Sequence, residues 1–157
     1  MITKDDLVGT WKLESWTIGY SDRDDFSYPF GEDPQGLLMY SAEGWMSASI
    51  ARRERPPFPD AENFRKLSDD LKAGAFSSYF HYAGRYQVAH GDVTHYVSQS
   101  LNPNFPGTEQ LRHAELDGHT LVLSGKDQVG DVTRFHSLVW HRIPLPEGDD
   151  HLVIDSD

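Results

Sequence analysis

Four polar side chains share one strand face on either side of a turn in the segment THYVSQSLNPNFPGTEQLRH, residues 94–113. His95 and Gln99 precede the turn, and Gln110 and Arg112 follow it. A two-residue period is typical of β-strands, in which alternate side chains point the same way. An imidazole exchanges protons near neutral pH, and a planar guanidinium holds a carboxylate or a developing oxyanion. The segment therefore predicts a binding or catalytic site if this face is turned inward.

Two Asp/Gly turns allow the direction of these side chains to be predicted, because a two-residue hairpin loop fixes which residues pair. A turn at residues 91–92 places His95 opposite Val88, on an apolar face. A turn at residues 117–118 places Arg112 on an apolar face as well. A slip of one residue would reverse both assignments.

The last predicted strand, DVTRFHSLVWHRI, allows two orientations. Leu138 and Trp140 favour an inward face that also carries Arg134, His136 and Arg142. The opposite orientation, with Phe135 and Val139 inward, fits the pattern nearly as well.

Inward-facing Arg and His side chains have two explanations, because an unpaired buried charge costs several kcal/mol. In the first, each of these side chains meets a Glu or Tyr inside the protein or reaches water near a rim. In the second, they are the few polar groups that converge in an apolar pocket, which is the usual form of a small-molecule site. The sequence leaves both explanations open for His95 and Arg112.

The elements that would position these residues are mostly short strands in sequential hairpins. Thr3 caps a short N-terminal helical turn, and residues 37–51 predict a hairpin. Residues 21–36 predict a loop, and helical spacing predicts an inserted helix over about 68–83 that would close one end. About eight antiparallel strands most easily lose their edges by closing into an up-and-down barrel. The expected organisation is one mainly β domain over residues 1–143 and an acidic tail over 144–157.

Composition excludes several classes of partner and site. The formal net charge of −11 repels nucleic acid backbones and anionic membrane surfaces, so neither partner is expected. The absence of cysteine excludes disulfides, thiolate metal sites and cysteine nucleophiles. No metal-ligand spacing, nucleotide-binding loop or serine-hydrolase elbow is present, so no metal or cofactor is expected. The charged N-terminus and the lack of a long apolar run predict a cytoplasmic protein.

Several longer segments resemble one family. These are LVGTWKLESW, PFGEDPQGLLMYSAEGWMSA, FHYAGRYQV, VTHYVSQSLNPNFPGTEQLRHAELDG and the closing LVWHR. Together they resemble the bacterial and fungal lipocalin-like domain family over about residues 7–142. The resemblance implies a lipocalin-type barrel in which Trp11 lies near the closed end and Arg142 covers it. It also implies binding of small apolar molecules, and some members of the family accompany enzymes of secondary metabolism as isomerase-like or cyclase-like barrels.

Three functions follow from these residues. The first is a barrel that binds a small, mostly apolar or aromatic molecule carrying a carboxylate, carbonyl or enolate-like oxygen, which Arg112 would pair. The second is a cofactor-free isomerase, cyclase or dehydratase of polyketide-like metabolism, with His95 as the base and Arg112 stabilising an oxyanion. The third is a structural or partner-binding domain with a filled interior, and the sequence leaves open whether the chain forms a homo-oligomer.

The residues predicted to carry these functions fall into two groups. The candidate catalytic pair is His95 and Arg112. The candidate ligand-binding residues lie on predicted strands and on the predicted helix, and they are Tyr40, Met46, Tyr79, Tyr86, Gln99, Gln110, Arg134 and Trp140.

Overall fold

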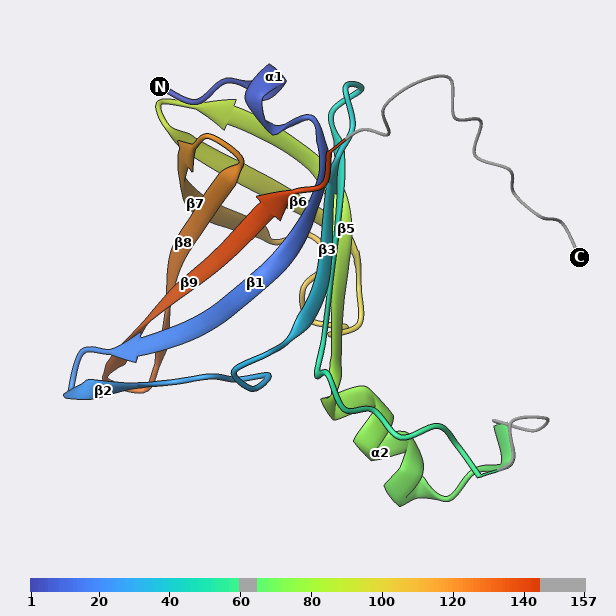
Figure 1. Cartoon of the computed structure of the whole chain (residues 1–157). Coiled ribbons are helices and arrows are strands. Elements are labelled where there is room, and N and C mark those ends of the chain that lie inside the picture. The colour runs from blue at the N-terminus through green and yellow to red at the C-terminus, as the bar shows by residue number, and fades with distance from the viewer. Residues whose placement is uncertain (60–64, 145–157) are drawn as a thin grey trace, which may run out of the picture.

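The computed structural model describes residues 1–59 and 65–144. Within them the chain forms nine strands and two short helices (Figure 1). In chain order these elements are α1 (Lys4–Leu7), β1 (Gly9–Tyr20), β2 (Arg23–Ser27), β3 (Gln35–Tyr40), β4 (Trp45–Ala51), α2 (Asp69–Ser77), β5 (Tyr79–Ala89), β6 (Asp92–Ser100), β7 (Glu109–Asp117), β8 (Thr120–Val129) and β9 (Val132–Arg142). Most of the predicted acidic tail, residues 145–157, lies outside the described residues.

A closed antiparallel barrel of eight strands, with β2 as an extra strand, organises the molecule. Neighbouring strands follow the order β2-β1-β3-β4-β5-β6-β7-β8-β9, and β1 also pairs with β9. The β1–β9 ladder runs from Trp11 opposite Arg142 to Tyr20 opposite Arg134. Closure removes the exposed edges that an open sheet would leave. The predicted mainly β barrel is confirmed.

The strand β2 corrects the prediction of a loop over residues 21–36. It pairs with the far end of β1, where Ile18 lies opposite Ser27. Its sequence, RDDFS, is charged, and four of its five residues are exposed. A short strand of this kind buries too little apolar surface to give the alternating pattern by which strands are recognised in a sequence.

The inserted helix is shorter than predicted. Ser68 caps it as expected, because its Oγ accepts a hydrogen bond from the backbone N–H of Leu71. The helix ends at Ser77, however, and residues 79–83 belong to β5, which pairs with β4 from Tyr79 onward. Pairing along a whole strand thus overrides a local helical spacing of apolar residues.

The position of α2 also differs from the prediction that this helix closes one end of the barrel. Figure 1 shows α2 extending away from the strands, beyond the start of β5. None of its residues is buried. Gly84, the predicted end of the helix, instead lies where β5 approaches β6 closely. A Cβ at this position would fall 1.9 Å from the carbonyl oxygen of Tyr96, so only glycine fits without a shift of the backbone.

Two β-bulges change which residues face the interior. On β1 the register shifts between Leu13 and Ser15, so Glu14 is the extra residue and Trp16 turns inward, contrary to uninterrupted alternation. On β6 the register shifts between Val97 and Gln99, and Gln99 is exposed instead of inward-facing. An extra residue reverses the facing of everything beyond it, because side chains alternate with a period of two.

The closed end of the barrel is built around Trp11, which is fully buried. Its indole N–H donates to the carbonyl oxygen of Leu7 at 2.9 Å. The guanidinium carbon of Arg142 lies 4.2 Å from the centre of the Trp11 ring, and Arg142 Nη1 donates to the carbonyl of Val8 at 2.9 Å. Its Nη2 donates to the carbonyl of Asp6. The expected covering of Trp11 by Arg142 is confirmed.

We expect Arg142→Ala to lower the free energy of unfolding by about 2–3 kcal/mol, because it removes a cation–π contact and leaves two carbonyls at the closed end without their donors. The measurement is urea unfolding followed by tryptophan fluorescence. Arg85→Ala is the matched control, since Arg85 stacks on the exposed ring of Trp45 at 4.7 Å on the outer surface. That variant should lose less than about 1 kcal/mol. Equal losses in the two variants would contradict the assigned role of Arg142.

Candidate functional site

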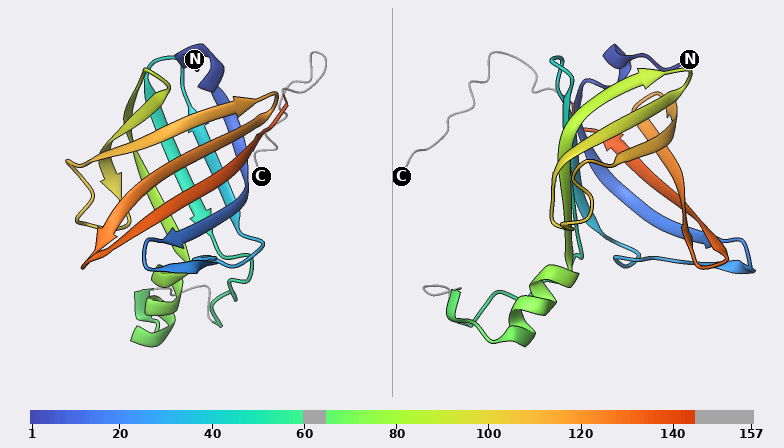
Figure 2. Two further views of the ribbon diagram at one scale, coloured as in Figure 1. Left: turned by 90° about the vertical axis from the view of Figure 1, so that its left-hand side faces the viewer. Right: turned by 180° about the vertical axis from the view of Figure 1, so that it is seen from behind.

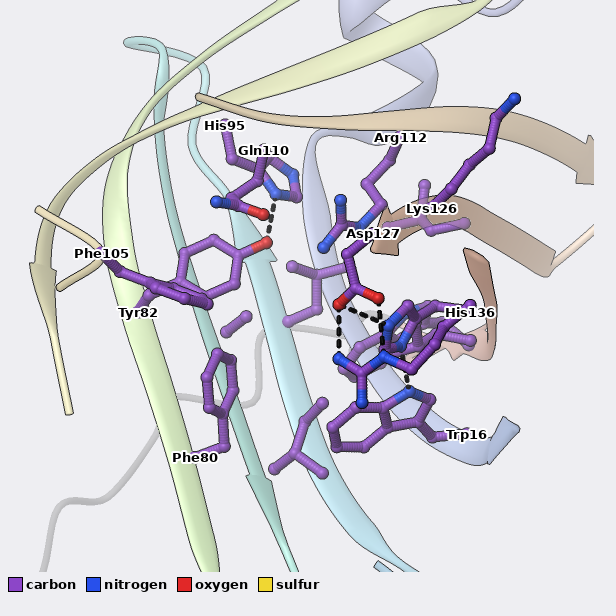
Figure 3. Close-up of a pocket in the computed structure, with 17 residues that line it drawn as sticks. Trp16, Phe80, Tyr82, His95, Phe105, Gln110, Arg112, Lys126, Asp127 and His136 are labelled. Atoms are coloured by element: carbon purple, nitrogen blue, oxygen red, sulfur yellow. Dashed lines mark hydrogen bonds and ion pairs between the residues drawn. The ribbon is translucent and has the colours of Figure 1, made fainter. Parts of the chain in front are cut away.

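An internal cavity of about 240 Å³ opens between the strands away from the closed end. Figure 3 shows side chains from many strands of the barrel pointing into it. The apolar residues of its wall are Trp16, Leu38, Ala48, Ile50, Phe80, Phe105, Leu123, Leu138 and Trp140. The remaining lining residues are polar or charged, namely Tyr82, His95, Gln110, Arg112, Lys126, Asp127, Arg134 and His136. Apolar walls with a few polar groups are the usual composition of a small-molecule site.

His95 is buried and fully hydrogen-bonded. Its Nε2 lies 2.6 Å from the Tyr40 hydroxyl and its Nδ1 lies 2.6 Å from the Tyr82 hydroxyl. One ring nitrogen of a neutral imidazole donates and the other accepts, so the two hydroxyls take opposite roles. Burial, and secondarily the charge of Arg112, lowers the pKa of His95 from 6.5 to about 3. His95 is therefore neutral at pH 7.

A second network of hydrogen bonds connects the side chains of Trp16, His136, Asp127 and Arg134 across three strands. The Trp16 indole N–H donates to His136 Nδ1 at 3.1 Å, which assigns the remaining proton to Nε2. That nitrogen lies 3.0 Å from Asp127 Oδ2, and Arg134 Nε donates to Asp127 Oδ1 at 2.7 Å. The dashed lines in Figure 3 trace these contacts.

In these contacts the positive charge of Arg134 and the negative charge of Asp127 neutralise each other. The hydrogen bond from Arg134 holds the pKa of Asp127 below its usual value. Burial lowers the pKa of His136, although Asp127 opposes this shift. The wall at Asp127 therefore carries one negative and one positive charge in direct contact, beside a neutral imidazole.

Arg112 differs from Arg134, because among the described residues it has no ion-pair partner. Its Nη1 donates to the carbonyl oxygen of Leu111 at 2.8 Å, and it has no carboxylate partner within residues 1–59 and 65–144. Its side chain lies across Gly125, where a Cβ would fall 2.8 Å from Arg112 Nη1. In Figure 3 the guanidinium points into the cavity. Arg112 thus presents a positive charge in a partly apolar space.

Comparison with known proteins identifies the family of this barrel. A family model described as a lipocalin-like domain matches residues 8–143. The chain belongs to the lipocalin-like domain family. The resemblance of its sequence motifs to this family is therefore confirmed, and the fold and internal cavity support binding of small molecules by this member of the family.

Two solved structures are also similar to the chain, and both are mutants of the fluorescent protein UnaG in which one asparagine is replaced. The mutant with alanine at that position is 18% identical, with 90% of this chain and 99% of that chain covered and a TM-score of 0.38. The mutant with glutamine there is 17% identical, with 88% and 96% covered and a TM-score of 0.36. No curated protein matches the chain significantly. Among the described residues, no helix is long and apolar enough to cross a membrane.

Five of the ten predicted site residues line the cavity. These are His95, Gln110, Arg112, Arg134 and Trp140. The inward orientation of the last strand is thus the one that Leu138 and Trp140 favoured, while Phe135 is 47% exposed on the outside. The indole N–H of Trp140 is buried without a hydrogen-bond partner among the described residues, so the wall contains one unsatisfied donor beside the apolar surface of this ring.

The other five predicted residues lie elsewhere. Tyr40 does not line the cavity, but its hydroxyl is hydrogen-bonded to Nε2 of His95, which does. Met46 and Tyr86 pack in the core, and the Tyr86 hydroxyl donates to the carbonyl of Ser41. Tyr79 lies at the start of β5 with the guanidinium of Arg55 5.2 Å from its ring centre, and Gln99 is exposed beyond the bulge of β6.

Several lining residues were not predicted as site residues. Asp127 follows Leu121 and Leu123 at the same two-residue parity, so simple alternation along β8 would have found it. A bulge on β1 reverses the facing of Trp16, so simple alternation does not find it. Tyr82 lies on β5, whereas the sequence placed it on the predicted helix. In the part of the chain that the structure describes, no group of three or more His, Asp or Glu side chains is arranged to hold a metal ion.

The neutral state of His95 predicts acid sensitivity. Since its pKa is about 3 in the fold and about 6.5 in the unfolded chain, the unfolded state binds more protons between these values, and stability rises with pH there. We expect His95 to account for a loss of about 2 kcal/mol in the free energy of unfolding between pH 7 and pH 5.

Urea unfolding at the two pH values measures this contribution. His95→Gln should show a smaller loss than the natural protein, because its side chain does not titrate. His119→Gln is the control, since His119 is exposed in the β7–β8 turn. This control should keep the full pH dependence. An unchanged pH dependence in His95→Gln would contradict a neutral, buried His95.

Proposed function

We propose that this protein binds a small, mostly apolar molecule in its barrel and pairs a carboxylate or similar anionic oxygen of that molecule with Arg112. One observation carries the proposal: the Arg112 guanidinium faces the cavity without a carboxylate partner in the described chain, whereas Arg134 is neutralised by Asp127. Arg112 is half-buried, so its charge is available in the cavity without a carboxylate already bound to it. A guanidinium–carboxylate hydrogen bond is stronger than a neutral one, so an anionic ligand would be the preferred partner.

The charges near the cavity favour an anionic ligand, although the chain as a whole is negatively charged. The chain carries a formal net charge of −11, but the charged groups that point into the cavity are Arg112 and Arg134 against a single carboxylate, Asp127 (Figure 3). Charges farther than about 8–10 Å are largely screened in physiological salt, so the nearby cations dominate at the site. A planar guanidinium also offers two parallel donors to a carboxylate.

The apolar part of the wall supports a ligand with a hydrocarbon or aromatic body. Phe80 and Phe105 give rings on one side of the cavity and Trp16 gives a ring on the other (Figure 3). Leu38, Leu123 and Leu138 give aliphatic surface. The volume of about 240 Å³ lies just below the roughly 300–1,000 Å³ of drug-sized ligand sites. A short chain or one to two rings suits this space.

The enzymatic alternative has less support from the geometry. A general base works best with a pKa near the operating pH, and the pKa of His95 is about 3. Both of its nitrogens are also occupied by tyrosine hydroxyls. This arrangement suits a residue that fixes the positions of Tyr40 and Tyr82, and it supports the binding function over the isomerase or cyclase function.

Titration calorimetry with octanoate and 1-octanol tests the proposal, because the two probes share a chain and differ in charge. We expect the natural protein to bind octanoate more tightly than octanol. Arg112→Met should weaken octanoate binding at least ten-fold, which is the effect of about 1.4 kcal/mol, and should change octanol binding less than about two-fold.

Arg85→Met provides the control, since Arg85 lies on the outer face of β5 and stacks on Trp45. It should leave the affinities for both probes unchanged. Equal affinity of the natural protein for the two probes, or octanoate binding that survives Arg112→Met, would refute the proposal.

A further inference from the structure

The strands β7 and β8 are paired over only half of their length. Their ladder runs from Asp117 opposite Thr120 to His113 opposite Ser124. Beyond that point β7 still pairs with β6 as far as Glu109, and β8 still pairs with β9 as far as Val129. The left view of Figure 2 shows the two strands diverging from their shared turn. Residues 109–112 and 125–129 therefore line the two sides of a break in the barrel wall.

A groove on the outer surface follows this break. It has a volume of about 700 Å³ and is lined in part by Leu111 from β7 and Phe135 from β9. These side chains are 56% and 47% exposed, so the groove presents apolar surface to a ligand. The groove and the internal cavity share three lining residues, Lys126, Asp127 and His136. The outer groove and the interior thus meet across β8.

Arg112 lies at the narrow end of the break. Its side chain crosses from β7 over Gly125 of β8, and a Cβ on Gly125 would fall 3.0 Å from Arg112 Cδ and 3.1 Å from the carbonyl oxygen of Leu111. Arg112 Nη1 donates to that same carbonyl. The guanidinium therefore borders both spaces: it lines the cavity, and its nearest residues, Leu111 and Gly125, line the groove.

We propose that the outer groove is a second subsite of the same binding site, and that it takes an apolar substituent that branches from the ligand beside its carboxylate. With the ligand body in the cavity and the carboxylate on Arg112, such a substituent would pass between β7 and β8 and cover Leu111 and Phe135. This inference rests on the proposed function, because it needs the carboxylate at Arg112. The ligand class it names is an acylated amino acid or another acid substituted next to its carboxylate.

Two probes test the subsite, N-octanoylglycine and N-octanoylphenylalanine, which differ only in a benzyl group next to the carboxylate. The shallow groove would bury part of this group, so we expect the phenylalanine probe to bind the natural protein about five-fold more tightly. Phe135→Asp and Leu111→Asp should each remove this difference and leave the affinity for N-octanoylglycine within about two-fold. The measurement is titration calorimetry.

Met39→Asp is the matched control, because Met39 is 46% exposed on the strand β3 and does not line the groove. It should keep the preference for the phenylalanine probe. Equal affinities of the natural protein for the two probes, or a preference that survives both groove variants, would overturn the subsite while leaving the proposed function standing. Failure of octanoate to bind the natural protein would overturn the proposed function, and the subsite with it, whereas failure of N-octanoylglycine alone would overturn only the subsite.

Discussion

The ladder between β1 and β9 is the constraint on which the rest of the structure depends. It joins the first and last strands of the sheet, so alternate residues of every barrel strand share one enclosed interior. It also brings Arg142 over Trp11 at one end and Arg134 near the other. Without this closure the polar groups of β6, β7, β8 and β9 would lie on an open sheet face, where water would screen them.

The enclosed interior gives two arginines different roles. Arg134 meets Asp127 on the neighbouring strand, and the pair is further held by His136 and Trp16. Arg112 faces the same space, but it donates to a backbone carbonyl and has no carboxylate partner in the described chain. Internal pairing, the first of the two explanations open at the level of the sequence, accounts for His95 and Arg134. Arg112 remains the candidate for the second, a convergent polar site.

Many residues of the cavity wall could be predicted from the sequence, although the predicted strand pairing was wrong in two hairpins. In both hairpins the observed pairing differs from the predicted one by two residues. The turns lie at 90–91 and 118–119, so Val88 pairs with Val93 instead of His95. A shift of two residues keeps every side chain on its predicted face, which is why His95 and Arg112 point inward as expected. The bulges at Glu14 and Ser98 each add one residue, so the side chains beyond them lie on the face opposite to the predicted one. They arise from how neighbouring strands fit together, and a single strand's pattern does not contain that information.

The bulge at Glu14 has a further consequence for how this barrel can vary in length. Along β1 the inward positions are odd-numbered up to Leu13 and even-numbered from Trp16 onward. Glu14 has no ladder partner on β9, although its carboxylate lies 2.9 Å from His141 Nε2 of that strand. A deletion at the bulge would therefore leave Leu13 and Trp16 both facing inward, two positions apart on a regular strand. A deletion at Lys12 would instead turn Trp11 and Leu13 to opposite faces. The bulge is therefore the position on β1 at which one residue can be removed without changing which side chains of the strand face the interior.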